Sequence, residues 1–370
     1  MGTRFNLSYE DFGLKKIDLY IIKKFLGTFF FSIVLILSIA VVFDITEKID
    51  NFYENNAPLK AIIFDYYLNF IPFYAYLFTP LFTFISVIFF TSKMANNTEI
   101  VAILASGVSF RRFLMPYAIS ALVITIFSFF LGAFVIPRSS EIKLDFENKY
   151  VDKFKSENAR NVQMEIERGT ILYIENFDKA TNVGYKFSLE KFDNKTLISR
   201  LTAQQVTWDS TYNWHLNSYV KRKFDGMRET LKKGDSLKIK IPIEPKELFI
   251  SSEEAPQMSL IDLRDYLKRQ KERGIGSIQA FEDEYYRRYS MPLAAIIMTL
   301  IGVTLSSKKI RGGMGLNLGI GLGLSSLYVL FITMSSTFAV SGIMPTMLAV
   351  WLPNILFLSV GIYLYQIAPK

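Results

Sequence analysis

Cysteine is absent from this chain of 370 residues, and histidine occurs only once. Without cysteine no disulfide can stabilise the fold, and with His215 as the single imidazole the usual ligand sets for zinc are missing. The chain also has no G-x-x-x-x-G-K-[ST] motif for nucleotide phosphates and no G-x-S-x-G motif for a hydrolase. We therefore expect no bound metal or cofactor, and we expect His215 to lie on the surface of a strand.

Charge is also scarce over much of the chain. Charged residues make up 21% of the sequence, and five long stretches contain none of them: 25–43, 66–92, 113–137, 289–307 and 312–369. A soluble domain needs charge on its surface, whereas a charge at the centre of a bilayer costs roughly 2.5–3.5 kcal/mol. The sequence therefore predicts a polytopic membrane protein. It excludes a single soluble domain, a secreted disulfide scaffold and a disordered tail.

The lengths of these stretches predict the number of membrane spans. A helix needs about 20 apolar residues to cross the hydrocarbon. The first four stretches fit one span each, and the fifth fits two, with a break at 341–345, where Ser-Gly-Ile-Met-Pro favours a turn. We expect six transmembrane helices, at 25–44, 64–92, 112–137, 287–307, 314–340 and 345–367.

The short loops predict the orientation of the spans. Basic residues precede the first span and occupy the loops after the second and fourth: Lys15, Lys16, Lys23, Lys24, Lys93, Arg111, Arg112, Lys308, Lys309 and Arg311. The loop 44–63 on the other side is mainly acidic. By the positive-inside rule both termini are expected in the cytoplasm and residues 138–286 outside it. The net charge of +8 does not imply nucleic acid, because no basic cluster is interleaved with aromatic residues.

The outer segment alternates in hydrophobicity in the way that β-strands do. Residues 169–175 and 237–241 alternate apolar and polar side chains, and strands at 206–208 and 213–216 flank a predicted turn at 209–210. Several short strands with closely spaced turns are typical of a sandwich or a jelly roll. A helix is expected to follow, with Ser259 as its N-cap and an apolar face formed by Leu260, Leu263 and Leu267.

The loop 96–107 is predicted to contain a short amphipathic helix. Thr98 is its expected N-cap, Glu99 suits its first turn, and Gly107 ends it. One face carries Ile100, Ile103 and Leu104. A permease would dock such a helix in a cleft of a cytoplasmic motor, with Glu99 opposite a basic residue; the alternative is an ordinary capped helix at the membrane surface. No carboxylate lies near the middle of any predicted span, so we expect a partner rather than an ion gradient to supply energy.

The predicted organisation has four parts. They are an N-terminal membrane half at 1–137 with a cytoplasmic coupling helix at 97–107, an extracytoplasmic all-β jellyroll domain at 138–258, a connecting amphipathic helix at 259–286, and a C-terminal membrane half at 287–370.

Two further patterns are candidates for function. In the fifth span, Gly315, Gly319 and Gly323 recur every four residues, a spacing that lets helices approach closely, either within this chain or between subunits. Cations at the outer ends of the spans suit either anionic head groups or simple anchoring at the membrane surface; they are Lys48, Lys60, Arg138, Arg287 and Arg288.

The loop sequence resembles a known family. Glu99-Ile-Val-Ala-Ile-Leu-Ala-Ser-Gly-Val-Ser109 is similar to the E-x-x-A-x-x-A-S-G-x-S loop of the LptF/LptG permeases, which take part in lipopolysaccharide export. Residues 284–294, 311–315, 342–345 and 351–354 also look like family segments, and the order of three spans, an outer β-domain and three spans agrees from end to end. The chain resembles the LptG type more than the LptF type.

The resemblance implies a set of partners. Two related permease chains share one bacterial inner-membrane complex, driven by a cytoplasmic ABC ATPase dimer that the glutamate of the loop helix, here Glu99, contacts. An apolar groove of the β-jellyroll receives the lipid and passes it to single-span and soluble periplasmic jellyroll proteins. A lateral gate forms between span one of one chain and span five of its partner. Relatives hold the phosphorylated lipid with basic residues near the outer end of span one, where Lys48 is the best candidate among mainly acidic neighbours.

Two other classes of protein remain alternatives at this point. One is the permease of another ABC system with a large periplasmic domain, for lipoprotein release or mechanotransmission, which usually has four spans per chain. The other is a membrane enzyme with an external catalytic domain, for which 138–258 shows no nucleophile–base pair and no cluster of metal ligands.

Overall fold

The computed structural model describes residues 15–151, 158–178, 181–193, 196–226, 228–245, 248, 252–272, 278–308 and 313–368. The described chain divides into two compact units. The helical unit comprises the described residues of 1–144 and 283–370, and the β-unit those of 145–282.

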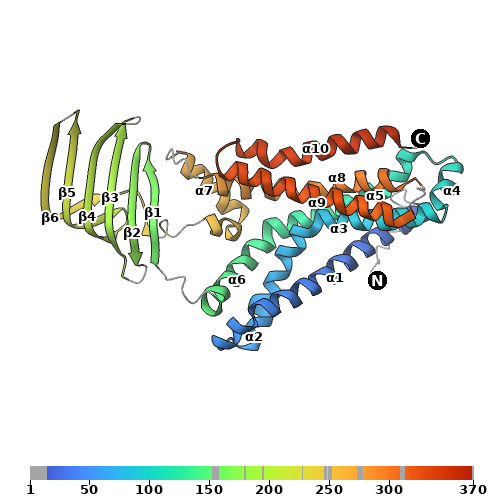
Figure 1. The fold of residues 1–370 in the computed structure, drawn as a ribbon, viewed down its shortest axis with the longest axis horizontal. Coiled ribbons are helices and arrows are strands. Elements are labelled where there is room, and N and C mark those ends of the chain that lie inside the picture. Colours follow the sequence, from blue (N-terminus) through green and yellow to red (C-terminus); the bar gives the residue numbers. More distant parts are fainter. Residues whose placement is uncertain are drawn as a thin grey trace, which may run out of the picture. The chain divides into compact units, whose positions relative to one another are not determined.

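Among the described residues, six helical segments are long and apolar enough to span a membrane, which confirms the predicted polytopic fold with an inserted β-domain (Figure 1). A short helix, α4 (Glu99–Ala105), lies between the second and third segments. The six segments are α1 (Lys16–Glu54); α2 (Leu59–Ala61), η2 (Ile62–Tyr67) and α3 (Leu68–Asn96); α5 (Phe110–Phe130), η3 (Leu131–Val135) and α6 (Ile136–Tyr150); α8 (Gln279–Ser306); α9 (Gly313–Val340); and α10 (Thr346–Ile367).

The helices extend beyond the uncharged stretches from which they were predicted. α1 continues through charged residues at both ends of the predicted span 25–44, because a helix satisfies its own backbone and its charged ends can remain in water. The predicted break between the last two spans is present: α9 ends at Val340 and α10 begins at Thr346. Gly342 adopts a left-handed φ of +72° in this turn, a conformation that glycine allows at little cost.

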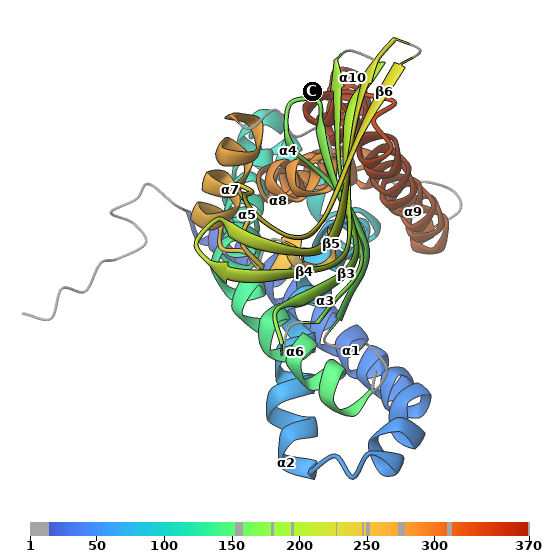
Figure 2. The ribbon, with the colours of Figure 1, turned by 90° about the vertical axis from the view of Figure 1, so that its left-hand side faces the viewer.

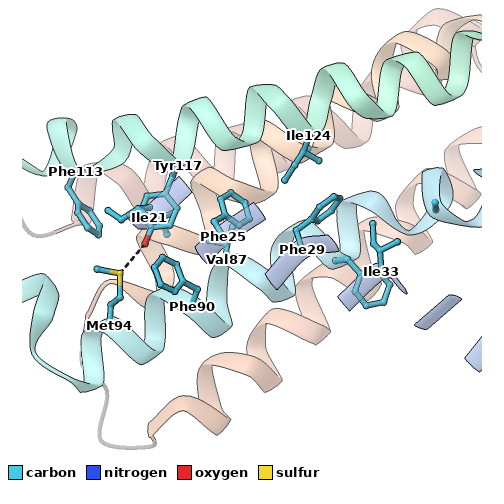
Figure 3. Packing of buried hydrophobic residues seen from close by; sticks show 14 of the residues in the cluster. Ile21, Phe25, Phe29, Ile33, Val87, Phe90, Met94, Phe113, Tyr117 and Ile124 are labelled. Carbon is cyan, nitrogen blue, oxygen red and sulfur yellow. Dashed lines mark hydrogen bonds between the residues drawn. The ribbon is translucent and has the colours of Figure 1, made fainter. Parts of the chain in front are cut away.

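The helical unit has two core clusters. The first is formed mainly by α1, α3 and α5, and the second by α3, α8, α9 and α10. In the first cluster Phe25 and Phe29 of α1 pack with Val87 of α3 and with Tyr117 and Ile124 of α5 (Figure 3). The second cluster contains Phe84, Ile88, Ala294, Met298, Ile301, Tyr328 and Phe357. α3 contributes to both clusters and is therefore central to the bundle.

The β-unit contains one six-stranded antiparallel sheet in the order β1-β2-β3-β4-β5-β6. The strands are β1 (Asn158–Glu167), β2 (Thr170–Asp178), β3 (Val183–Asp193), β4 (Thr196–Ser210), β5 (Asn213–Asp225) and β6 (Arg228–Lys240). Trp214 lies in the buried face of the sheet and donates a hydrogen bond from Nε1 to the carbonyl of Ile243, at 3.1 Å, so the segment after β6 covers part of that face. The β-domain is confirmed. Its jellyroll topology stays a prediction, because a jelly roll pairs two sheets and the described strands form one.

A crease crosses this sheet. The pairing places Asn161, Glu175, Lys186, Gln204, Ser218 and Asp235 in one row across the six strands. Every second strand has a left-handed residue in this row, namely Asn161, Lys186 and Ser218. The alternation of buried and exposed side chains shifts by one residue at the crease, since Ile174 and Phe177 of β2, three positions apart, both belong to the same core. The strands turn part-way along their length (Figure 2). A hydrogen bond with Glu175 raises the pKa of Lys186 within this row.

Two local predictions for the β-unit have different outcomes. The hairpin between β4 and β5 turns at Thr211 and Tyr212, so the predicted turn at 209–210 is wrong by two residues; β4 continues to Ser210, which pairs with Asn213. Ser259 does cap α7 (Leu260–Glu272), since its Oγ accepts a hydrogen bond from the backbone N–H of Asp262 at 3.2 Å. The short η5 (Ser252–Gln257) precedes this helix.

Candidate functional sites at the two ends of the helical unit

The two ends of the helical unit differ in the elements they expose. α4 lies at the same end as the start of α1 and the end of α10, and α2 lies at the opposite end (Figure 1). We refer to these as the α4 end and the α2 end. Lys93, Arg111, Arg112 and Lys308 lie at the ends of helices or in loops at the α4 end; Lys309 and Arg311, which also entered the predicted orientation, lie outside the described residues.

Backbone conformation, rather than a side-chain cap, begins α4. Thr98 has a left-handed φ of 62°, and its hydroxyl donates to the carbonyl of Asn97 at 2.6 Å. Thr98 occupies the predicted N-cap position, but its side chain makes no capping hydrogen bond, because such a bond requires an extended backbone that aims the oxygen at the first turn. Asn97 Nδ2 instead donates to Glu99 Oε1 at 3.0 Å. Gly107, with φ +88°, follows the end of the helix.

The apolar face of α4 points into its own chain. Ile100 is 1% exposed in the first core cluster, and Ile103 and Leu104 pack against that cluster. The surface that α4 presents outward consists of Val101, which is 61% exposed, with Ala102 and Ala105. Glu99 stands half-buried at the N-terminal end of the helix. A small, smooth surface next to one carboxylate suits a shallow pocket that carries a basic group at its rim.

At the α2 end, Lys48 is part of a cluster of polar groups. Its ammonium group lies 3.1 Å from Asp44 Oδ1, donates a hydrogen bond to the hydroxyl of Tyr66, and lies 4.8 Å from the centre of the Tyr66 ring. Tyr66 and Tyr67 both donate to Asp44, each at 3.2 Å, because the π-helical η2 turns two adjacent hydroxyls toward one carboxylate. Lys143 of α6 lies 5.8 Å from the centre of the same Tyr66 ring. The cluster thus contains two ammonium groups and one carboxylate.

The other predicted head-group contacts are separate from this cluster. Lys60 on α2 and Arg138 on α6 are exposed, and within the described chain neither occurs in a recorded ion pair. Arg287 forms an ion pair with Asp283, and Arg288 forms one with Glu284 at 2.9 Å. Lys143 is not among the predicted head-group contacts, because it follows the third span in a segment rich in both signs of charge.

The charged start of α8 is buried rather than exposed. Asp283 is 1% exposed and accepts hydrogen bonds from Arg287 and, at 2.8 Å, from Ser336 of α9. α8 begins at Gln279 rather than at the predicted 287, so this buried carboxylate lies in the same helix but before the predicted span. The Asp283–Arg287 spacing of four residues was visible in the sequence, but its burial depends on Ser336, 53 residues further along the chain.

The glycines of the predicted packing face lie on open surface. A Cβ atom added at Gly315, Gly319 or Gly323 would meet no other atom within 4 Å, whereas one added at Gly321 would collide with Ile88 of α3. Of the two predictions for the glycine repeat, close packing within this chain receives no support, and a surface for a second chain or for lipid remains. Gly321 is the glycine that packs inside the chain.

The described part of the β-unit shows no arrangement typical of a catalytic site. His215 of β5 lies on the sheet surface, where its Nε2 lies 2.6 Å from Ser236 Oγ. Among the described residues no group of three or more histidine, cysteine or acidic side chains is placed to hold a metal ion.

Comparison with known proteins agrees with this layout. The family model described as "Lipopolysaccharide export system permease LptF/LptG" matches residues 19–367, which is nearly the whole chain. No curated protein matches the chain at a significant level. The matched region includes both ends of the helical unit and the β-unit.

Proposed function

Because the chain belongs to the LptF/LptG family of lipopolysaccharide export permeases, we propose that it is a transmembrane subunit of an ABC-type exporter. In this role it extracts lipopolysaccharide from the inner membrane and passes it to a periplasmic β-jellyroll bridge, in support of outer-membrane biogenesis. Family membership and six membrane helices make the chain a multi-pass transport component of the inner membrane. The motor, the direction of transport and the partners are what the proposal adds.

The outward face of α4 carries the proposal. A cytoplasmic ABC ATPase dimer docks on Val101, Ala102 and Ala105, and a basic residue of the ATPase meets Glu99. Ile100, Ile103 and Leu104, predicted as coupling residues, serve by anchoring α4 to the core, because their side chains already pack there. Gly107 ends the helix and leaves its exposed face clear.

Energy for the transfer must come from such a partner. Removing acyl chains from a bilayer costs about 0.8 kcal/mol per CH₂, so a lipid with several chains costs on the order of tens of kcal/mol. The chain itself has no P-loop motif. ATP hydrolysis is therefore assigned to the partner, and this chain is not the enzyme.

The proposed orientation places the α4 end in the cytoplasm. Lys93, Arg111, Arg112 and Lys308 lie at that end, while the loop 44–63 at the α2 end is mainly acidic. Both termini are then cytoplasmic, and the β-unit is periplasmic. In this orientation Lys48, Lys60, Arg138 and Lys143 stand in the outer leaflet, where they attract the phosphates of the lipid.

A second related permease chain completes the membrane part. In the lateral gate of the family, span one of one chain meets span five of its partner. α1 and α9 suit this gate because each has an exposed face, which on α9 carries Gly315, Gly319 and Gly323. The β-unit offers one buried sheet face and two sheet edges for the onward transfer to single-span and soluble jellyroll proteins.

The test is reconstitution of the chain and its co-purified partners in vesicles that contain lipopolysaccharide. We expect ATP-dependent delivery to a soluble acceptor that is abolished by Glu99→Arg and by Val101→Asp, because both place a charge where the ATPase docks. Glu54→Arg, which changes the same type of residue at the α2 end of α1, is the matched control and retains delivery.

The two α4 variants must also be shown to act at the surface. Val101 is exposed, so Val101→Asp keeps the thermal stability of the chain but no longer retains the ATPase on an affinity column. If no ATPase associates with the wild-type chain, the proposed function is wrong. If the ATPase binds Val101→Asp normally, the docking face is elsewhere.

A further inference from the structure

A bidentate ion pair joins the first turns of α1 and α5. Arg112 Nη1 lies 2.8 Å from Asp18 Oδ1, and Arg112 Nη2 lies 2.5 Å from Asp18 Oδ2. The backbone N–H of Lys15 also donates to Asp18, at 2.8 Å. Asp18 is 2% exposed, and a carboxylate that is removed from water to this extent depends on its charged partner. The two residues are 94 positions apart in sequence, so the pair is a tertiary contact.

The same pair links α1 to the start of α5, which directly follows α4 in the chain. α4 ends at Ala105 and α5 begins at Phe110, so four residues join them. The last of these, Ser109, caps α5 by accepting a hydrogen bond from the backbone N–H of Arg112 at 3.3 Å. Arg112 therefore contacts the α4–α5 connection through its backbone and α1 through its side chain.

α1 is one continuous helix that runs from the α4 end to the α2 end. Its 39 residues contain no proline, and at 1.5 Å per residue it is about 58 Å long. One stripe of side chains, Ile21, Phe25, Phe29, Ile33 and Leu37, packs against the bundle (Figure 3), and the next buried residue of α1 is Phe52. The α4 half of the helix is thus held by its neighbours, while Asp44 and Lys48 of the polar cluster lie in the other half.

We propose that Arg112 and Asp18 are positioning residues that transmit movement of the ATPase-docking helix α4, through the first turn of α5, to α1. A displacement of α5 shifts the first turn of α1, and the stiff helix carries that shift to the lipid-facing cluster at the α2 end. The inference rests on the proposed function, and it assigns a role to two residues that touch neither the motor nor the lipid.

A guanidinium group suits this task better than an ammonium group would. Two parallel hydrogen bonds fix the direction of the Asp18 carboxylate as well as its distance, whereas a lysine would supply a point charge on a flexible stem. Arg111, the neighbour of Arg112, is exposed and is not part of this ion pair, which makes it the matched control.

The experiment uses the reconstituted complex and two measurements. The first is the amount of lipopolysaccharide delivered per ATP hydrolysed. The second is the distance between spin labels on Tyr53→Cys, at the far end of α1, and Met347→Cys, at the start of α10; the chain has no cysteine of its own, and both positions are exposed. In the wild type we expect this distance to change when a non-hydrolysable ATP analogue binds.

Asp18→Arg and Arg112→Asp should each lower the delivery per ATP by at least about fivefold, the low end of typical couplings between sites, and should remove the nucleotide-dependent change of distance. Arg112→Lys, which keeps the charge, should lie between these variants and the wild type. The exchange of both residues, Asp18→Arg with Arg112→Asp, should restore both measurements, and Arg111→Asp should alter neither. Size-exclusion profiles confirm that each variant is folded.

Normal coupling in folded Asp18→Arg and Arg112→Asp complexes would overturn the role of the pair. So would a failure of the exchanged pair to restore what both single variants lose, because the residues would then not act through each other. A wild-type complex without ATP-driven delivery would instead contradict the proposed function, and this outcome is recognised before any variant is compared.

Discussion

α3 and α8 differ from α1 and α9 in how much of their apolar surface this chain covers. In the most apolar part of each helix, 61% of α3 and 72% of α8 are buried, but only 22% of α1 and of α9. All four helices are apolar enough to span a membrane. Apolar character therefore places a helix in the bilayer, but it does not decide which helices form the core. The uncovered faces of α1 and α9 are available to lipid or to a second chain.

Polar side chains link the less buried helices α9 and α10 to the buried helices α3 and α8. Asn317 of α9 donates to Ser92 of α3 at 3.0 Å, and Asn354 of α10 donates to the carbonyl of Ser290 in α8 at 2.7 Å. Tyr328 donates to Asn354 at 2.7 Å within the same layer. Lipid cannot satisfy such groups, so hydrogen bonds between helices compensate for a weak hydrophobic driving force. α1 makes its polar contacts with other helices near its two ends, through the Asp18–Arg112 pair and through the hydrogen bonds of Asp44 and Lys48 with η2.

The largest effect that would test this difference is a cavity in α3. Phe84 is 0% exposed and packs in the second core cluster, whereas Phe31 of α1 is 69% exposed. We expect Phe84→Ala to lower the free energy of unfolding of the purified chain by about 3 kcal/mol, because its neighbours cannot fill the space. Phe31→Ala, the matched control, should change it by less than about 0.5 kcal/mol. The measurement is unfolding in mild detergent, and equal losses would remove the distinction between the two helices.

Much of this layout could be predicted from the sequence. The uncharged stretches predicted six membrane helices, and Gly342 and Pro345 marked the break between the last two. These features are local, because a charge or a proline acts on the helix in which it lies. The π-helical segments η2 and η3 were not predicted, since a widened helical turn leaves no period of its own in the sequence.

The features that were not predicted depend on contacts between residues far apart in the sequence. Glu99 and the loop helix were predicted, but the inward direction of Ile100 depends on the core beneath it. The crease of the β-sheet interrupts the period-two pattern between Ile174 and Phe177. A single strand does not show that this irregularity is part of a row across the sheet, because the row depends on the register of all six strands. The Asp18–Arg112 pair spans 94 residues, and no local pattern indicates it.

A moderate effect should separate the two faces of α9. A leucine at Gly321 would meet Ile88 of α3, so we expect Gly321→Leu to destabilise the isolated chain by about 1–3 kcal/mol through overpacking. A leucine at Gly319 meets nothing within 4 Å and should leave the stability of the isolated chain unchanged. The glycine spacing alone predicts a close helix contact at Gly319, either within this chain or between subunits. Because this chain places nothing near Gly319, we expect Gly319→Leu to weaken only the association with a second chain. Co-purification of differently tagged permease chains measures that association.

The smallest effect concerns the net charge of the polar cluster at the α2 end, to which α1 contributes Asp44 and Lys48. Asp44 lies 3.1 Å from the Lys48 ammonium group and so offsets part of the positive charge of Lys48 and Lys143. Asp44→Asn removes that carboxylate and keeps a similar shape. We expect it to tighten binding of vesicles that contain anionic lipid by about 1 kcal/mol, roughly fivefold, while Lys48→Ala weakens binding by a similar amount. Both changes should diminish in high salt. Weaker binding by Asp44→Asn would mean that the carboxylate orients Lys48 toward the lipid and that the exposed face of α1 depends on geometry more than on net charge.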